Sequence, residues 1–265
     1  MTTGSTPGTV VFIGAGPGAA DLITLRGARW LARAEVVLFD ALTDPALRDL
    51  APQARWVDVG KRGFRHSTGQ ATIDALLVAM ARTHAVVVRL KGGDPSVFGR
   101  LEEELQALAT HGVAAEVVPG ITAALAAAAD TQRPLTRRGQ GRSVALSTAM
   151  TREGELRAAQ QADTEVFYMA GRQLGALGRR LLAAGWAADT PVSVVSLAGW
   201  PDQRASDHTP ATLGAASLLH AGRPTVVTVG AGARPVGKHR ADRDTGAPIR
   251  PQVDCGQDSV QTRTA

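Results

Sequence analysis

The chain has 265 residues, of which 44% are hydrophobic, and a formal net charge of +5 at pH 7. This length and apolar content are enough for one large or two small hydrophobic cores. Aromatic residues make up only 4% of the chain, and no RNP-like or helix-turn-helix pattern occurs, so the small excess of positive charge does not predict a nucleic-acid-binding surface.

The sequence also lacks the signals of membrane, secreted and metal-dependent proteins. No apolar run approaches about 18 residues, and the first residues, MTTGSTPGTV, lack the basic start and apolar core of a signal peptide. We therefore expect no membrane span and a cytoplasmic location. Cys255 is the only cysteine, and the histidines show no HxxxH spacing. Hence neither an internal disulfide nor a structural metal site is expected.

From residue 9 to about residue 130, short apolar runs alternate with amphipathic stretches. This is the pattern of a mostly parallel sheet covered by helices. Strands are predicted at 9–14, 35–40, 56–60, 85–92 and 114–120, and helices at 20–33, 70–83, 99–110 and 121–129. The pattern predicts a first α/β domain at 9–130, preceded by a flexible N-terminus at 1–8.

The segment 131–142, TQRPLTRRGQGR, interrupts this pattern with one proline, two glycines and four arginines, and it predicts a linker between domains. A second α/β domain is predicted at 143–230. Its strands are expected at 143–148, 164–170, 190–196 and 224–229, and its helices at 153–160, 173–184 and 212–220. Residues 231–265 contain almost no large apolar side chains, which predicts a disordered tail.

The stretch VVFIGAGPGAADLITL, residues 10–25, joins the first strand to a glycine-rich turn. Its Gly14-x-Gly16-x-x-Ala19 spacing is typical of loops that bind a dinucleotide phosphate. Pro17, however, supplies no N–H group to a phosphate, and Asp21 near the start of the next helix would repel one. The loop alone therefore leaves three interpretations open: a phosphate site, a structural tight turn, or a site for another ligand.

Asp40 ends the second apolar run, EVVLFD, and three further loops start at the ends of predicted strands, near residues 59, 87 and 117. Because the carboxyl ends of parallel strands share one edge of a sheet, these loops are expected to lie together where open α/β sheets bind ligands. A carboxylate there could hold a ribose, serve a reaction, or merely cap a turn. The position of Asp40 alone does not separate these roles.

Seven motifs occur in uninterrupted order between Thr9 and Gly230: GAGPG, FDAL, VGKR, RLKGGDP, VFGR, VVPGIT and PLT. Together they make the chain resemble the tetrapyrrole methylase family. The resemblance implies two α/β domains with an active-site cleft between them, a homodimer, and S-adenosylmethionine as the cofactor. It implies no phosphate-binding loop, so Pro17 would lie at the cleft.

The resemblance further implies roles for particular residues. Asp40 would be the base and Lys61 the proton donor. The cofactor would be bound by Pro17, Gly92, Gly93, Asp94, Val97, Thr122, Ala123, Met169 and Ala198. A tetrapyrrole rich in carboxylates would be held by basic side chains, first of all Arg62, His66 and Arg138, with Arg65, Arg89, Arg137 and Arg142 as further candidates.

The activity implied by the resemblance is the transfer of two methyl groups to carbon atoms of uroporphyrinogen III. The product, precorrin-2, would serve sirohaem or cobalamin synthesis. Three alternatives remain: a methyltransferase for a related tetrapyrrole, a protein that binds the cofactor and a tetrapyrrole with weak catalysis, and a nicotinamide oxidoreductase suggested only by the glycine spacing and Asp40.

Several positions depart from the usual family pattern, mostly in the predicted second domain. They leave Asp40, Lys61 and most expected cofactor contacts unchanged, but they could alter activity or substrate. The departing positions are Gly69, Leu101, Glu102, Arg137, Gly139, Ala149, Met150, Ser196, Leu197, Ala198 and Gly199.

Overall fold

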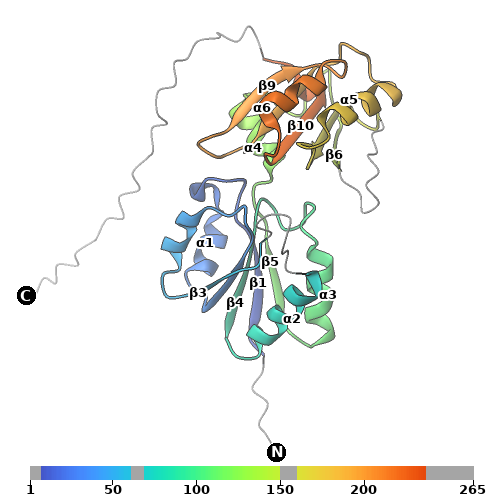
Figure 1. Ribbon diagram of the computed structural model, residues 1–265. Coiled ribbons are helices and arrows are strands. Elements are labelled where there is room, and N and C mark those ends of the chain that lie inside the picture. Colours follow the sequence, from blue (N-terminus) through green and yellow to red (C-terminus); the bar gives the residue numbers. More distant parts are fainter. Residues whose placement is uncertain (1–6, 61–68, 150–159, 237–265) are drawn as a thin grey trace, which may run out of the picture. The chain divides into compact units, whose positions relative to one another are not determined.

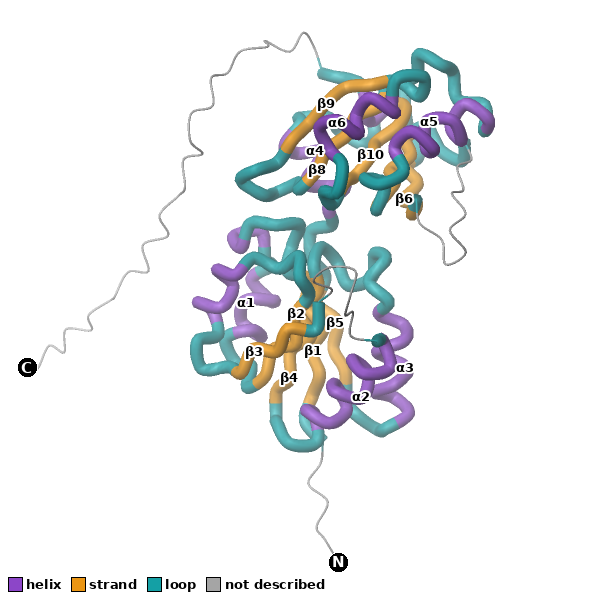
Figure 2. Tube along the Cα trace, in the orientation of Figure 1, coloured by secondary structure: helices purple, strands orange, loops and turns teal. Residues whose placement is uncertain are grey.

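A computed structural model of the chain describes residues 7–60, 69–149 and 160–236. The residues up to Arg234 form one compact unit, and a second unit begins at Pro235. The first unit contains two five-stranded sheets, each with its own helices (Figures 1 and 2). The α/β fold class expected from the sequence is confirmed.

The first sheet is entirely parallel, with strand order β3-β2-β4-β1-β5. Its central strands are continuous apolar runs because both faces of the sheet are covered. Each observed strand lies within or next to a predicted one, and the bounds are β1 (Thr9–Gly14), β2 (Val36–Phe39), β3 (Arg55–Asp58), β4 (Val86–Lys91) and β5 (Ala115–Val118).

Alternate side chains of β1 enter two separate cores, as the two-residue period of a strand requires. Val10 and Phe12 pack with the helices α2 (Gln70–Ala81) and α3 (Leu101–Thr110). Val11 and Ile13 pack on the opposite face with α1 (Leu25–Leu31) and the 3-10 helix η2 (Pro45–Leu50). Figure 1 shows α1 on one side of this sheet and α2 with α3 on the other.

The helix predicted at 20–33 is divided in the structure. A 3-10 turn, η1 (Ala20–Leu22), precedes α1, and Thr24 lies between them. The hydroxyl of Thr24 accepts a hydrogen bond from the amide of Gly27 at 3.1 Å, so Thr24 caps the N-terminus of α1. The sequence pattern predicted one helix because apolar residues continue through the cap.

The second sheet is mixed, with order β6-β7-β10-β8-β9. The pair of β6 (Val144–Thr148) and β7 (Thr164–Tyr168) is parallel, whereas β10 (Thr225–Gly230), β8 (Val192–Ser196) and β9 (Arg204–His208) make antiparallel pairs. Strand β9 was not predicted. Its sequence, RASDH, is polar because β9 lies at the sheet edge and is largely accessible to solvent.

One face of the second sheet is covered by α5 (Leu174–Ala183) and η3 (Leu213–Ala216), which is followed by α6 (Ser217–His220). Leu174, Leu177, Leu181 and Leu213 pack there against strand residues such as Phe167. All but the last residue of the helix predicted at 153–160 lies outside the described residues.

Helix α4 (Ala123–Asp130) requires a correction to the predicted boundary at residue 130. Its alanines pack with residues of β7, β8 and β10, and therefore with the second sheet. The predicted linker at 131–142 also packs on this sheet: Arg133 forms an ion pair with Asp207, and Thr164 donates a hydrogen bond to the carbonyl of Leu135. The chain therefore passes from the first sheet to the second before α4. The proline and glycines of residues 131–142 mark a packed turn.

The predicted tail also begins too early at residue 231. Ala231–Ala233 form a buried 3-10 helix, η4, and Ala231 donates its amide hydrogen to the carbonyl of Asp163. These residues are too small to give an apolar signal, yet their close packing orders the backbone. Residues 237–265 and 1–6 lie outside the described residues.

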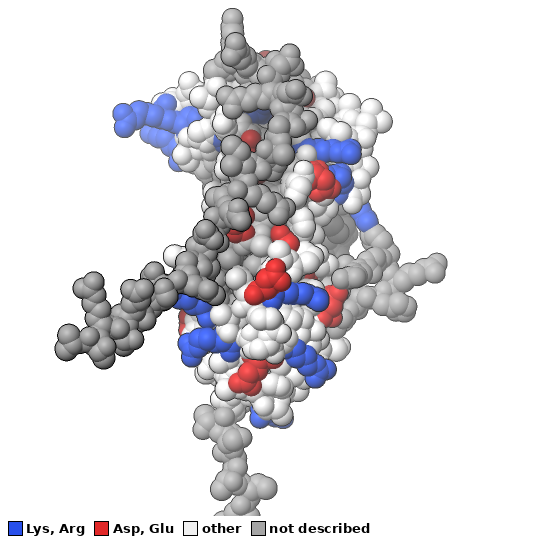
Figure 3. Space-filling model, turned by 90° about the vertical axis from the view of Figure 1, so that its left-hand side faces the viewer, with Lys and Arg blue, Asp and Glu red and all other residues white. Residues whose placement is uncertain are grey.

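The surface carries basic and acidic side chains together. On the face drawn in Figure 3, Lys and Arg residues lie among Asp and Glu residues. Across the described ranges, no helix is both long and apolar enough to cross a membrane. In the same ranges, no group of three or more His, Cys, Asp or Glu side chains is arranged as a metal site.

Candidate active site

The glycines of the opening loop bring three strand-end loops into contact. Gly16, with φ of +82°, and Gly93 exchange backbone hydrogen bonds of 3.3 and 2.6 Å. A Cβ on Gly14 would lie 2.5 Å from the Cα of Gly120, which is too close for any side chain. Gly14 and Gly16 thus form a structural turn, the second of the three interpretations of this loop.

Asp94 joins two of these loops through its carboxylate. Its Oδ1 accepts a hydrogen bond from the amide of Ser96 at 2.8 Å, and its Oδ2 accepts one from the amide of Gly120 at 2.9 Å. Hydrogen bonds from backbone amides to an ionised group are stronger than neutral ones. Asp94 therefore fixes the KGGDP turn after β4 against the end of β5.

A cavity of about 180 Å³, here called the apolar cavity, lies beside this turn. Its walls come from loops after strands of both sheets and from the start of α4. All nine residues expected to bind the cofactor line it: Pro17, Gly92, Gly93, Asp94, Val97, Thr122, Ala123, Met169 and Ala198. The structure thus brings together residues that are separated by more than half of the sequence.

The chemistry of the apolar cavity limits what it can bind. Among the described residues that line it, Asp94 is the only charged one. A phosphate would therefore meet a carboxylate and no cation. An uncharged ring system or a ligand with positive charge is a better match for these walls.

Tyr168 also lines the apolar cavity, although no motif in the sequence predicts a role for it. Its hydroxyl lies 2.8 Å from that of Thr122 and accepts a longer hydrogen bond, 3.4 Å, from the amide of Ala124. Burial raises the pKa of Tyr168, so the hydroxyl stays protonated. The ring packs against Phe98, with centroids 5.1 Å apart. Its position next to Met169 was the only signal in the sequence.

A larger cavity of about 560 Å³, here called the polar cavity, adjoins the apolar cavity and shares Leu42, Gly92 and Val97 with it. Asp40 lies in its wall, with a side chain that is 31% exposed. Nη2 of Arg89 donates a 2.7 Å hydrogen bond to Oδ1 of Asp40. Within the described part of the chain, no residue bonds to Oδ2 of Asp40.

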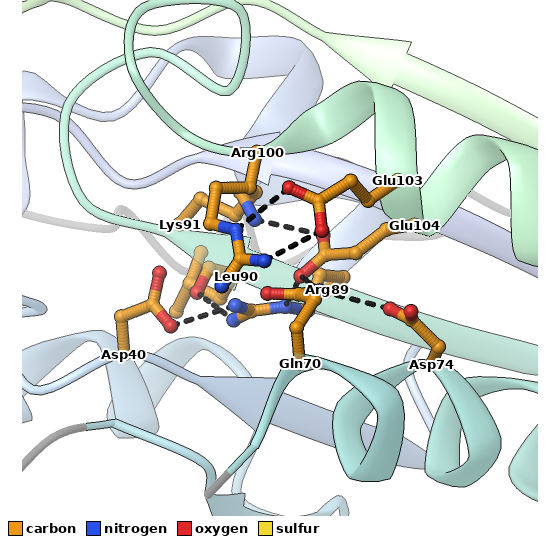
Figure 4. A network of polar contacts seen from close by, with 9 residues as sticks. All are labelled: Asp40, Gln70, Asp74, Arg89, Leu90, Lys91, Arg100, Glu103 and Glu104. Carbon is orange, nitrogen blue, oxygen red and sulfur yellow. Dashed lines mark hydrogen bonds and ion pairs between the residues drawn. The ribbon is translucent and has the colours of Figure 1, made fainter. Parts of the chain in front are cut away.

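Arg89 belongs to a buried network of charges whose members also line the polar cavity (Figure 4). Glu104 of α3 is fully buried and accepts hydrogen bonds from Nε of Arg89 at 3.2 Å and from Nζ of Lys91 at 2.7 Å. Gln70 of α2 donates to the same carboxylate at 3.3 Å. Arg89 thus pairs with two carboxylates of the protein, and because it also lines the polar cavity, its role as a substrate ligand stays a prediction.

Lys91 is the least favourably placed charge of this network. Burial lowers its pKa, the nearby Arg89 lowers it further, and Glu104 acts in the opposite direction. Glu104 is thus the partner that favours the charged form of the buried Lys91. We call Asp40, Arg89, Lys91 and Glu104 the buried charge network.

Of the predicted proton donor and the three first-named substrate ligands, only Arg138 lies within the described residues. Lys61, Arg62 and His66, together with Arg65, lie outside the described residues. Arg138 is exposed in the turn closed by Arg137 and Gly141, and it lines neither cavity.

A buried histidine contacts the residue that immediately precedes part of the wall of the apolar cavity. His220 is fully buried, and its ring nitrogens contact the hydroxyls of Ser196 and Ser206, each at 2.9 Å. Ser196 immediately precedes Leu197 and Ala198 in the cavity wall. Burial, followed by the charges of His208, Arg223 and Arg204, lowers the pKa of His220 to about 4.

This pKa predicts an acid-labile fold. At a pH above 6.5, the ordinary pKa of histidine, His220 is neutral in both the folded and the unfolded chain. As the pH falls below 6.5, the unfolded chain binds the proton first. The free energy of unfolding should therefore fall between pH 6.5 and about 4, by on the order of 3 kcal/mol from this group. Urea unfolding over this range should show a smaller fall for His220→Gln. The exposed His111→Gln should behave like the wild type, and equal falls in all three would contradict the assignment.

Known proteins with similar sequences point to one family. The model of the family described as Tetrapyrrole (Corrin/Porphyrin) Methylases matches residues 9–214. A uroporphyrinogen-III C-methyltransferase of Synechocystis sp. is 40% identical over 233 residues, which cover 84% of this chain and 89% of the relative. One of Pseudomonas aeruginosa is 45% identical over 201 residues, covering 74% of this chain and 82% of the relative.

A solved structure has the same fold. The uroporphyrin-III C-methyl transferase from Thermus thermophilus, complexed with S-adenyl homocysteine, matches with a TM-score of 0.74 and 35% identity. The match covers 84% of this chain and 97% of that one. The chain belongs to the tetrapyrrole (corrin/porphyrin) methylase family.

Proposed function

We propose that this protein is an S-adenosylmethionine-dependent C-methyltransferase that converts uroporphyrinogen III into precorrin-2 by two methyl transfers, for sirohaem or cobalamin synthesis. One observation carries the proposal. All nine residues expected to hold the cofactor line the apolar cavity, and this cavity adjoins a polar cavity whose wall contains Asp40. The names of the relatives support the choice of substrate.

The residues of the apolar cavity fit S-adenosylmethionine. This cofactor carries a purine, a sulfonium and an amino acid group but no phosphate. Apolar walls suit the purine, and the negative charge of Asp94 favours a positively charged ligand over a phosphate ester. Gly92 and Gly93 let a ligand approach the backbone closely because neither residue has a side chain, although the amide and carbonyl of Gly93 are already bonded to Gly16. When bound, the cofactor supplies an electrophilic methyl group.

The proposed reaction forms one carbon–carbon bond at a pyrrole carbon and breaks the methyl–sulfur bond, after which a proton must leave the ring system. Asp40 is the base in this proposal. Arg89 holds Oδ1 of Asp40, so that Oδ2 can accept the proton at the wall of the polar cavity. Holding the pyrrole carbon, the methyl group and the departing sulfur in line, with Asp40 near the ring, is the main catalytic contribution expected of the protein.

Lys61 as proton donor, and Arg62, His66 and Arg138 as ligands of the substrate carboxylates, remain proposals that rest on the resemblance. The same holds for a homodimer in the cytoplasm. The homodimer can be tested by light scattering coupled to gel filtration, where a mass near 27.5 kDa, that of one chain, would reject it.

The function is tested by an anaerobic assay of the purified protein with S-adenosylmethionine and uroporphyrinogen III, followed by mass spectrometry. A dimethylated product that is absent without the cofactor is expected. Methylation of a later corrin precursor alone would assign a related substrate. Binding of S-adenosylhomocysteine, measured by calorimetry, without any methylation would favour the alternative of a protein that binds the cofactor with weak catalysis.

A further inference from the structure

Trp200 joins two walls of the apolar cavity that come from distant parts of the chain. It lines the cavity in the loop after β8, whereas Pro17 lines it in the loop after β1. The indole Nε1 of Trp200 donates a hydrogen bond to the carbonyl of Pro17 at 3.1 Å. Beside it, the amide of Ala19 donates to the carbonyl of Gly199 at 2.9 Å.

The two loops are packed so closely that small residues are required. A Cβ on Gly18 would lie 2.6 Å from Cδ1 of Trp200 and 2.7 Å from the carbonyl oxygen of Gly199. Gly199 has φ of +78°, and a Cβ there would lie 3.0 Å from Cγ of Pro17. The second half of the opening glycine loop, Pro17 and Gly18, is thus shaped to receive the indole.

The loop that carries Trp200 is itself held in place. The amide of Gly199 donates to Oδ2 of Asp130, at the end of α4, and to Oε1 of Gln203, both at 3.1 Å. The amide of Trp200 donates to the carbonyl of Leu197 at 3.0 Å, closing a turn in which Leu197 has φ of 52°. Hydrogen bonds therefore fix the backbone that carries the indole of Trp200 in the wall of the apolar cavity.

We propose that Trp200 is a further cofactor-binding residue, whose ring closes the apolar cavity and whose N–H group holds Pro17 in the cavity wall. This inference rests on the proposed function, because the ligand it assigns is the adenosyl cofactor. A large flat ring in an apolar wall offers contact area to a purine. The hydrogen bond to Pro17 keeps that contact preorganised, and preorganisation contributes directly to affinity.

The test is the dissociation constant of S-adenosylhomocysteine, measured by calorimetry. Trp200→Phe keeps a ring but loses the N–H donor, and it should weaken binding about fivefold, the effect of one ordinary hydrogen bond. Trp200→Ala also loses the ring and should weaken binding roughly a hundredfold. Trp56→Phe is the matched control, because the indole of Trp56 donates to the carbonyl of Ala51 at the same distance, 3.1 Å, outside the cavity. Its affinity should equal that of the wild type.

Two further readouts separate ligand contact from general destabilisation. Trp200→Phe should raise KM for S-adenosylmethionine with kcat nearly unchanged, since it removes binding common to ground and transition states. The change in tryptophan emission on adding S-adenosylhomocysteine should be present in the wild type and in Trp56→Phe and should be largely lost in Trp200→Phe. Should Trp200→Ala fail to fold, Trp200→Phe alone decides.

The outcomes distinguish this inference from the proposed function. A wild-type protein that binds no S-adenosylhomocysteine would reject the cofactor site and, with it, the role of Trp200. A wild-type protein that binds the ligand, together with Trp200→Phe of unchanged affinity, KM and emission response, would reject the role of Trp200 only.

Discussion

Asp40→Asn should lower the rate of methyl transfer by roughly 10²- to 10⁴-fold, the range for loss of a general base. Asparagine keeps the shape of the side chain and can still accept a hydrogen bond from Arg89, but its amide does not accept a proton from the ring. The affinity for S-adenosylhomocysteine should remain unchanged, because Asp40 lines the polar cavity and not the apolar one. Single-turnover methyl transfer and calorimetry on the same preparation measure the two effects.

Asp49→Asn is the matched control for this prediction, since Asp49 is exposed on η2 and lines neither cavity. It should retain wild-type turnover. Asp40→Asn with turnover within about threefold of the wild type would remove Asp40 from the chemistry. Its place beside Arg89 would then be purely structural.

The sequence predicted the first sheet well, for a physical reason, whereas the residues that line the apolar cavity were expected only from the resemblance to the family. Parallel strands are buried on both faces, so their sequences are continuous apolar runs. The carboxyl ends of these runs lie at one edge of the sheet. The loops there carry glycines at positions such as Gly14 and Gly16, where strand-end loops come too close for side chains. The spacing resembled a phosphate-binding loop because both uses of glycine need the same freedom from a Cβ.

The second half of the chain was harder to predict because its signals are local and weak. Strand β9 has a polar sequence, and α4 is so rich in alanine that periodicity does not tell which sheet it covers. The ion pairs of Arg89 were also missed, because the sequence does not place Asp40 and Glu104 beside it. The edge position of β9, the sheet that α4 covers and the ion pairs of Arg89 all depend on contacts between residues that are distant in the sequence. A single sequence does not show which residues make these contacts.

Glu104→Gln should destabilise the protein by about 3–5 kcal/mol, because it leaves the buried Lys91 without its carboxylate partner and removes one of the two carboxylates that pair with Arg89. The side chain of Glu104 is 0% exposed, and those of Arg89 and Lys91 are each 3% exposed. Glu103→Gln is the matched control. Glu103 is the adjacent residue, its side chain is 49% exposed, and it pairs with the exposed Arg100, so its loss should cost less than about 1 kcal/mol.

The pH dependence and a rescue make the origin of this loss testable. The pKa of Lys91 is already lowered from 10.5 by burial, and Glu104 is the nearest group that raises it. Without Glu104, the folded chain should release the Lys91 proton at lower pH, while the unfolded chain keeps its proton up to the ordinary value. Glu104→Gln should therefore regain stability as the pH rises, and adding Lys91→Met should restore part of it at neutral pH. Urea unfolding measures both effects; a loss independent of pH and unaffected by Lys91→Met would mean that Glu104 contributes packing and not charge balance.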